Sequence, residues 1–276
     1  MARHSAGTLG AGFLVFVLVL AVVAPWVTPY DPLAQDLDHP LLLPSVGHWL
    51  GTDDLGRDLL SRLMLGTQVS MAVGFGSAVL ALVIGTAAGL LAGYQSGWLS
   101  ATIMRVSDVL LAFPAVLLAM LVATVLKAGI SGVILSIAIV SLPTFARLAQ
   151  AVMLGQRQRV YVDAAIAFGA SPAYIIFRAV LPNVLAPLIV QTAFTVANAV
   201  LLEAGLSFLG LGIQPPNPSL GLMLQEARGY IRSDAWFGIC PGVLLILIVL
   251  ALNAAADTLG QLADPRSAIR GARTAL

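Results

Sequence analysis

The stretch "YVDAAIAFGASPAYIIFRAVLP" (residues 161–182) lies between two long apolar runs and resembles neither. It contains charged residues, a glycine, a Ser-Pro pair and a closing proline. These residues predict a helical hairpin, with a first helix over residues 160–168 that ends in a left-handed turn at Gly169. Ser171 is expected to cap a second helix, and Pro182 to stop it and open the next apolar segment.

Small side chains dominate the first helix of this hairpin. Ala164, Ala165 and Gly169 would let another protein approach closely, with Asp163 supplying a charge beside them. The alternative is an ordinary solvated loop. The residues alone leave both interpretations open.

The composition of the whole chain places it in a membrane. Of its 276 residues, 59% are hydrophobic and 10% are charged, with a mean hydropathy of +0.96. Soluble domains carry about 25% charged residues, so the solvent for this chain is expected to be membrane lipid. The net charge of +1 argues against a nucleic-acid partner. Cys240 is the only cysteine, which excludes an internal disulfide.

Charged residues divide the chain into uncharged runs. Six of them supply the about 17 to 25 residues that a membrane helix needs. They cover residues 5–30, 69–93, 109–126, 128–146, 179–202 and 235–256. The sequence therefore predicts an all-α integral membrane protein with six transmembrane helices. Pro114 and Pro143 fall inside two of the spans and are expected to kink them.

The distribution of basic residues predicts the orientation. With the N-terminus inside, nine of the 14 Lys and Arg residues lie in the cytoplasm, as the positive-inside rule requires. This N-in/C-in arrangement makes the opening stretch the longest cytoplasmic loop. A cleaved signal peptide is the alternative for the first span, but its uncharged run is too long and Pro25 directly follows the best cleavage position.

No catalytic motif is present in the sequence. The chain lacks a G-x-x-x-x-G-K-[ST] stretch, so a nucleotide site is expected on another polypeptide. His4, His39 and His48 are the only histidines and lie outside the expected spans. We therefore expect a chain that is not an enzyme by itself and that binds no cofactor.

A polar stripe in the fifth span is the candidate translocation path. Gln191, Thr195 and Asn198 share one helical face, and Thr192 lies beside them. Such a stripe faces a pore or bonds to a neighbouring helix, and both interpretations stay open. Ionisable residues occur only near the ends of the spans, whereas ion-coupled carriers usually keep them at mid-membrane.

The charged segment before the second span has a structural interpretation. Asp53 with Arg57, and Asp58 with Arg62, are spaced to form ion pairs along an exposed amphipathic helix. A metal site built from Asp53, Asp54 and Asp58 is the alternative. The two nearby arginines argue against it, and no metal site is expected.

The hairpin resembles a motif of ABC importer permeases. Asp163-Ala164-Ala165, then Gly169, then Leu181-Pro182 is similar to that family's "EAA" loop, Glu-Ala-Ala followed at fixed spacing by Gly and by Ile-x-Leu-Pro. The chain departs from it with Asp163 in place of Glu and Ala179 in place of Ile. Asp keeps the charge on a shorter arm. The resemblance implies that these residues form a coupling helix that docks on an ATPase subunit.

Three further blocks are similar to the C-type subunit of oligopeptide/dipeptide permeases. They are "HWLGTDDLGRDLLSRLMLGTQVSMAVG" (48–74), "DVLLAFPAVLLAM" (108–120) and "EAGLSFLGLGIQPPNPSLGLML" (203–224). "DPR" (264–266) resembles the usual cytoplasmic ending. The resemblance covers residues 40–266.

The resemblance implies a fold and a set of partners. The fold would be the transmembrane domain of a type I ABC importer. The partners would be a homologous permease in a heterodimer, two ATPase subunits or one fused ATPase carrying ATP and Mg²⁺, and an extracytoplasmic substrate-binding protein. The last is expected to dock on the exposed turn residues, which are Gln214, Pro215, Pro216 and Asn217. As the alternative, this turn is a simple connector.

The expected function is uptake of dipeptides or oligopeptides. Nickel-chelate or glutathione cargo on the same fold is the first alternative, and an ion-coupled transporter or channel is the second. The chain would comprise an N-terminal tail with the first helix (1–30), an extracytoplasmic segment with the amphipathic element (31–66), an ABC transmembrane domain (67–258) that includes the coupling loop (155–182), and a cytoplasmic tail (259–276).

Overall fold

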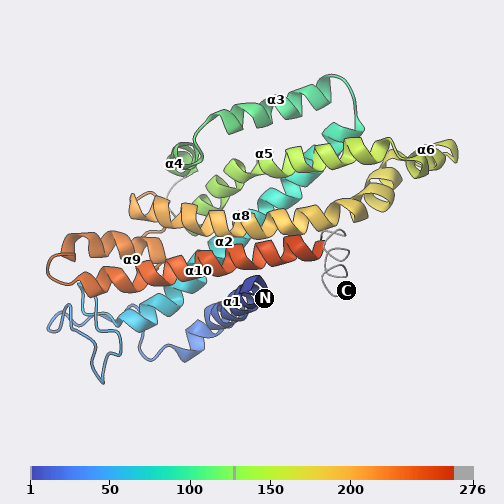
Figure 1. Ribbon diagram of the computed structural model, residues 1–276. Helices are drawn as coiled ribbons and strands as arrows, with labels where there is room; N and C mark the ends of the chain where they lie inside the picture. Colours follow the sequence, from blue (N-terminus) through green and yellow to red (C-terminus); the bar gives the residue numbers. More distant parts are fainter. Residues whose placement is uncertain (1, 127–128, 264–276) are drawn as a thin grey trace.

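The computed structural model describes residues 2–126 and 129–263, and helices form its framework (Figure 1). The "DPR" block and the rest of the expected tail from residue 264 lie outside the described residues. The long helices are α1 (Ala2–Val27), α2 (Leu59–Tyr94), α5 (Ile130–Arg157), α8 (Leu181–Phe208) and α10 (Ala235–Ala263). The shorter ones are α3 (Trp98–Ala112), α4 (Ala115–Leu126), α6 (Val160–Ala167), α7 (Pro172–Tyr174) and α9 (Leu220–Ala227), with a π-helical turn at Ile175–Val180 and a 3-10 turn at Arg228–Tyr230.

Within the described residues, four continuous helical segments are long and apolar enough to cross a membrane. They are Leu59–Tyr94, Ile130–Arg157, Pro172–Phe208 and Ala235–Leu262, and they correspond to the second, fourth, fifth and sixth expected spans. The described apolar part of α1, Gly12–Val27, is shorter. The all-α membrane fold is therefore confirmed, while the count of six spans and the N-in/C-in orientation stay predictions.

The third expected span is a bent pair of helices. α3 and α4 meet at an angle of 102°. Phe113, which joins them, has extended backbone angles (φ −86°, ψ 140°), the conformation that a following proline favours. Pro114 therefore breaks this span, whereas α5 continues through Pro143.

Glycines set the close packing of α2 on α5. Gly85, Gly89 and Gly93 recur every four residues and line one face of α2. A Cβ atom built on Gly89 would lie 2.1 Å from the carbonyl oxygen of Ala146 in α5. A Cβ on Gly85 would lie 2.6 Å from the carbonyl oxygen of Leu142. The two backbones therefore approach as closely as they do only because these side chains are absent.

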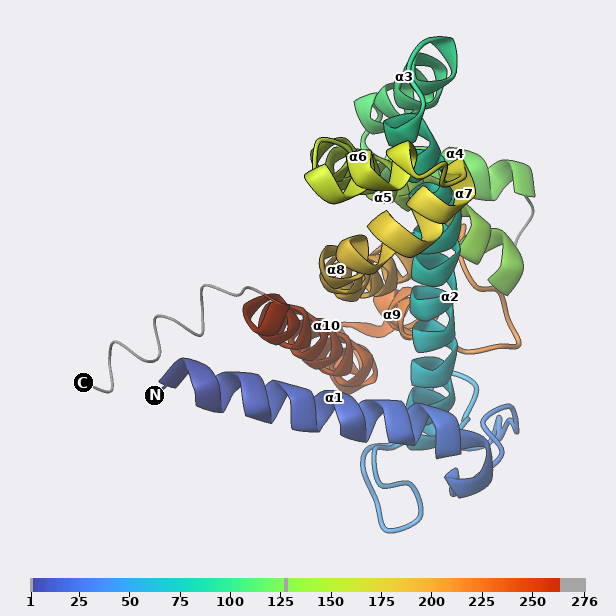
Figure 2. The ribbon, with the colours of Figure 1, turned by 90° about the vertical axis from the view of Figure 1, so that its right-hand side faces the viewer.

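The remaining long helices form a row beside α2. α5, α8, α10 and α1 follow one another in the row, and α2 crosses behind it diagonally (Figure 1). The end-on view shows α2 along one side of the row (Figure 2). α6 lies at one end of the molecule, whereas α9 and the segment before α2 lie at the opposite end (Figure 1).

The charged segment before α2 is not the exposed helix that its spacing predicted. Residues 53–58 form a turn, and α2 begins only at Leu59. Asp53, Arg57, Asp58 and Arg62 are all buried. The segment is folded against α9, a neighbour that local spacing cannot indicate.

Only one of the two predicted ion pairs forms. Arg57 Nε donates to Asp53 Oδ2 over 2.6 Å, as expected. Asp58 instead caps α2 by accepting from the Ser61 amide. Arg62 pairs with Asp53 and, at 3.0 Å, with Glu226 of α9.

Candidate functional site

The first helix of the predicted coupling hairpin is α6, and it ends where the sequence predicted. Gly169 has φ +76°, the left-handed conformation that glycine adopts without strain. Its amide donates to the Ile166 carbonyl, and the Ala170 amide donates to the Ala165 carbonyl. These two bonds form a Schellman motif, which satisfies the free carbonyls at the end of the helix.

One face of α6 is anchored and the other is free. Val162 is fully buried in a cluster with Met153, Ile175 and Val180. Asp163 and Ala164 are exposed, Ala165 is half-buried, and Phe168 is 93% exposed at the tip. Exposed arginines surround this surface, at positions 157, 159 and 178. α6 therefore presents small, acidic and aromatic side chains at the far end of the molecule.

The second half of the hairpin differs from the prediction. Ser171 caps α7 as expected, because its hydroxyl accepts from the Tyr174 amide. Pro182 does not stop the helix, which runs without a break from Pro172 to Phe208. The π-helical turn explains this, since the Leu181 amide bonds five residues back to Ile176 and the wider turn accommodates a proline. Leu181 is half-buried and Pro182 is exposed.

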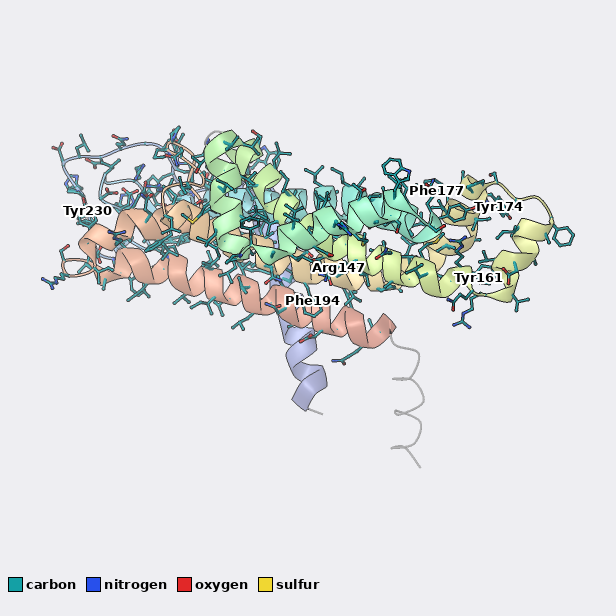
Figure 3. All side chains as sticks on the ribbon, turned by 90° about the horizontal axis from the view of Figure 1, so that it is seen from above. Arg147, Tyr161, Tyr174, Phe177, Phe194 and Tyr230 are labelled. Atoms are coloured by element: carbon teal, nitrogen blue, oxygen red, sulfur yellow. The ribbon has the colours of Figure 1, made fainter. Side chains whose placement is uncertain are left out.

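Tyr161 joins the hairpin to its neighbours, a role that the sequence did not indicate. Its hydroxyl donates to Gln156 Oε1 of α5 over 2.9 Å. Asn183 of α8 donates to the Ala179 carbonyl over 3.0 Å and approaches the Tyr161 hydroxyl at 3.4 Å. Figure 3 shows Tyr161 and Tyr174 near the same end of the molecule. The hairpin is thus linked by side-chain hydrogen bonds to α5 and α8.

The four residues of the candidate path lie on α8 as predicted. Gln191 and Thr192 are half-buried, Thr195 is buried and Asn198 is exposed. Gln191 Nε2 donates to Thr195 Oγ1 over 3.3 Å, and both threonine hydroxyls donate to carbonyls one turn back in α8. Within the described part of the chain, none of these four side chains bonds to another helix. Their polar groups are therefore not used to join α8 to a neighbour in this chain.

The candidate docking turn lies between α8 and α9. Pro215, Pro216 and Asn217 are exposed, and Gln214 is half-buried. Both ends of the turn are anchored, since Ile213 and Leu220 are almost completely buried. An exposed tip on a fixed base is a geometry suited to a protein contact.

A buried carboxylate fixes that base, and the sequence did not assign it. Glu203 of α8 is fully buried and accepts hydrogen bonds from Ser70 (2.8 Å) and Ser207 (2.7 Å). The two hydroxyls accept in turn from the amides of Leu220 and Ile213. The only local signal was a lone acid followed four residues later by Ser207.

The buried ion cluster holds the outer segment to α9. Oxygen atoms of Asp53, Asp54 and Glu226 lie within 4.8 Å of one another, and Arg57 and Arg62 pair with them. Glu226 thus occupies the place that the sequence-based metal alternative gave to Asp58. Burial raises the pKa of Glu226, and the two arginines oppose that increase. The guanidinium groups act as the counter-ions of these carboxylates.

Two protein families and several permease proteins are similar to this chain. The family described as "Binding-protein-dependent transport system inner membrane component" matches residues 85–269, and "N-terminal TM domain of oligopeptide transport permease C" matches residues 1–44. The chain is 39% identical to the dipeptide transport system permease protein DppC of Haemophilus influenzae (96% of this chain, 92% of that protein). It is 43% identical to the di/tripeptide permease protein DppC of Pseudomonas aeruginosa (95% and 89%) and 41% identical to the glutathione permease protein GsiD of Pectobacterium atrosepticum (91% and 85%).

A solved structure supports the fold. A chain of the inward-facing MetNI methionine ABC transporter superposes with a TM-score of 0.62 at 22% identity, covering 75% of this chain and 98% of that one. At this identity the likeness concerns the arrangement of the helices alone.

Proposed function

Because the chain belongs to the family of binding-protein-dependent transport system inner membrane components, we propose that it forms half of the translocation pathway of a peptide importer. Such a system is an ATP-binding-cassette importer, and the chain is its permease subunit in the inner membrane. The cargo proposed here is a dipeptide or tripeptide. Two relatives that are 39% and 43% identical to this chain are named as a dipeptide and a di/tripeptide permease protein. These names support the proposed cargo.

The proposed assembly has three kinds of partner. A homologous permease forms the second half of the pathway as a heterodimer. Two ATPase subunits, or one fused ATPase, bind on the cytoplasmic side and carry ATP and Mg²⁺, so this chain catalyses no hydrolysis. A substrate-binding protein docks on the outer side at Gln214, Pro215, Pro216 and Asn217 and delivers the peptide to the pathway.

The exposed face of α6 is the observation that carries this proposal. Asp163 and Ala164 of α6 and Phe168 directly after it are exposed, and α6 lies at the end of the molecule opposite α9 (Figure 1). Phe168 is 93% exposed, and docking in an ATPase groove would bury it together with the small residues of α6. When the ATPase subunits close on ATP, they would draw the two coupling helices together and open the spans outward. Hydrolysis would reset them.

Glutathione is the second candidate cargo, because the relative at 41% identity is named as a glutathione permease protein. For the test, the complete importer is reconstituted in proteoliposomes together with its binding protein. We expect ATP-dependent uptake of radiolabelled Ala-Ala, and the same vesicles are assayed with labelled glutathione. Uptake that persists without the ATPase subunits and stops on dissipating the ion gradient would instead show an ion-coupled transporter.

Two variants test the coupling helix itself. Gly169→Val places a branched residue at φ +76°, which costs about 1–3 kcal/mol of local backbone strain. Asp163→Lys reverses the exposed acidic charge without such strain. We expect both to accumulate with the partner permease and to lose most ATPase recruitment and uptake.

Gly155→Val is the matched control for these variants. Gly155 is also exposed, a Cβ there meets no atom within 4 Å, and its φ is not positive. This variant should recruit the ATPase normally. Full recruitment and uptake by both test variants would contradict the coupling role of α6.

A further inference from the structure

An ion pair joins α3 to α5 on the outside of the helix row. Arg147 Nη2 donates to Asp108 Oδ1, across 39 positions of sequence. Both side chains are more than half exposed, at 53% and 57%. The pair is therefore neither a core contact nor covered by any described part of this chain.

The fourth expected span, 128–146, ends just before Arg147, but α5 continues to Arg157, so a hydrocarbon core placed along α5 includes Arg147. α5 has 28 residues, about 42 Å of helix, whereas the hydrocarbon core of a bilayer is about 30 Å thick, or about 20 residues. Arg147 lies 17 residues from Ile130 and 10 from Arg157. A core that begins at Ile130 extends to about residue 150, and one that ends at Arg157 is centred near Arg147. Figure 3 shows Arg147 far from Tyr230 at one end and Tyr161 at the other.

The exposed surface of α3 has two different sides. Ala101, Arg105, Asp108 and Ala112 are spaced by four, three and four residues, so they share one exposed side of charged and small residues. Val106, on another side, is a large apolar residue that is 56% exposed and suits lipid. Charged side chains within spans face a bundle interior or water and not hydrocarbon. The side that bears Asp108 therefore does not face lipid.

α5 continues this polar side. Thr144, Arg147 and Ala151 are exposed at spacings of three and four, and Leu154 extends the side towards α6. The opposite side of α5 is occupied, because Leu142 and Ala146 lie against the glycines of α2.

A groove next to this side of α5 reaches the polar stripe of α8. Leu148, which follows Arg147, lines the groove together with Pro187, Gln191 and Phe194. Figure 3 shows Arg147 and Phe194 close together along the molecule. Gln191 of the polar stripe therefore faces a groove whose α5 wall is the residue next to Arg147.

We propose that Asp108 and Arg147 line the translocation path and bind the two charged termini of a zwitterionic peptide. This inference rests on the proposed function and specifies what part of the cargo is recognised. The Asp108 carboxylate would accept hydrogen bonds from the ammonium group of the peptide. The Arg147 guanidinium would donate two hydrogen bonds to the carboxylate of the peptide. In the absence of cargo, the two side chains bind each other. Exchange of partners keeps every charge hydrogen-bonded, so no charge is left unpaired in the path.

Labelling tests whether this surface meets water. Thr144→Cys and Ala151→Cys, in a Cys240→Ala background, place thiols one turn on either side of Arg147 without disturbing the pair. In inside-out vesicles of the complete importer, both should react with the anionic reagent 2-sulfonatoethyl methanethiosulfonate. Val106→Cys, at a position that is also exposed but on the apolar side of α3, is the control and should not react. Protection of both test thiols would overturn the proposal and indicate lipid or the partner permease there.

A double variant separates recognition from helix packing. Asp108→Leu with Arg147→Leu replaces the ion pair by an apolar pair, which a purely structural contact in lipid tolerates. We expect normal co-purification with the partner permease and uptake of Ala-Ala reduced about tenfold or more, because hydrogen bonds to both charged termini are lost. Wild-type uptake would show that the pair only joins α3 to α5. Loss of the partner permease would show a subunit interface, and either result overturns the proposal.

The two experiments also separate this inference from the proposed function. If the wild-type importer takes up no Ala-Ala, the peptide cargo is wrong, while labelling of Thr144→Cys and Ala151→Cys still decides whether the surface lines an aqueous path. If the wild type takes up Ala-Ala and the double variant matches it, only the inference fails. The labelling also decides the matter if the double variant does not accumulate.

Discussion

At the residue scale, Asp53 and Asp54 show how two adjacent carboxylates meet different environments. Asp53 is fully buried between Arg57 and Arg62, and it also accepts from the amides of Leu55 and Arg57. Asp54 forms a longer ion pair, with Arg57 Nη2 at 3.5 Å. Burial, followed by the negative charge of Asp53, raises the pKa of Asp54. Asp53 is therefore needed as the counter-ion of two buried arginines, whereas the charge of Asp54 is disfavoured.

The two isosteric variants should differ in stability. Asp53→Asn leaves two buried guanidinium groups undercompensated and should cost on the order of 3 kcal/mol. Asp54→Asn should be neutral or stabilising at pH 7. Its raised pKa means that the ionised form is disfavoured in the folded state, a penalty that develops as pH rises above about 4 and that Asn removes. Thermal denaturation of the intact importer measures both, and an equal loss in the two variants would contradict this account.

Single residues were predictable where their causes are local. Gly169 was expected at positive φ because the residues around it end one helix and begin another, and φ is +76°. Arg62 was assigned to Asp58 because that acid is four residues away, yet it pairs with Glu226, 164 residues distant. Spacing carries no information about a partner that only the packing of α9 brings near.

At the scale of elements, the contact between α2 and α5 depends on missing side chains. Gly85, Gly89 and Gly93 form a small-residue repeat that the charge pattern did not reveal, although the repeat itself is visible in the sequence. Apolar runs identified the long helices, and Pro114 indicated the bend after Phe113, but neither indicated the π-helical turn before Leu181. The bend and the turn both depend on how a proline is accommodated, and hydrophobicity does not report that.

Gly89→Val should prevent this packing. Its Cβ would lie 2.1 Å from a backbone carbonyl oxygen of α5, which cannot rotate away as a side chain can. We expect membrane accumulation of the folded subunit to fall several-fold, measured by fluorescence-detected size-exclusion chromatography of detergent extracts. Gly205→Val is the control, since a Cβ there meets no atom within 4 Å. Equal accumulation of the two variants would refute the close-packing argument.

At the scale of the whole molecule, the two candidate contact surfaces, α6 and the turn before α9, lie at opposite ends of the helices (Figure 1). Apolar runs predicted the helices and therefore the fold class, because each run must be helical in lipid. They could not predict that α2 crosses the row diagonally, nor that α3 and α5 share the polar side that includes Asp108 and Arg147. Those relations arise between segments that are distant in sequence.

Labelling of intact cells should establish the topology. Asp38→Cys and Asn217→Cys, both at exposed positions, should react with an impermeant maleimide in a Cys240→Ala background. Gln158→Cys, exposed beside α6, should react only after permeabilisation. The nine-to-five distribution of basic residues is the reason for this orientation. Labelling of Gln158→Cys from outside would reverse it.

The unbroken helix from Pro172 to Phe208 also has a mechanical consequence. Its 37 residues correspond to about 55 Å of helix measured along its path, with α6 next to one end and the turn at Pro215 and Pro216 next to the other. Figure 2 shows the α7 end turned away from the axis of α8, but no loop separates the two parts. Docking of a binding protein and closure of an ATPase would then act on the two ends of one continuous backbone.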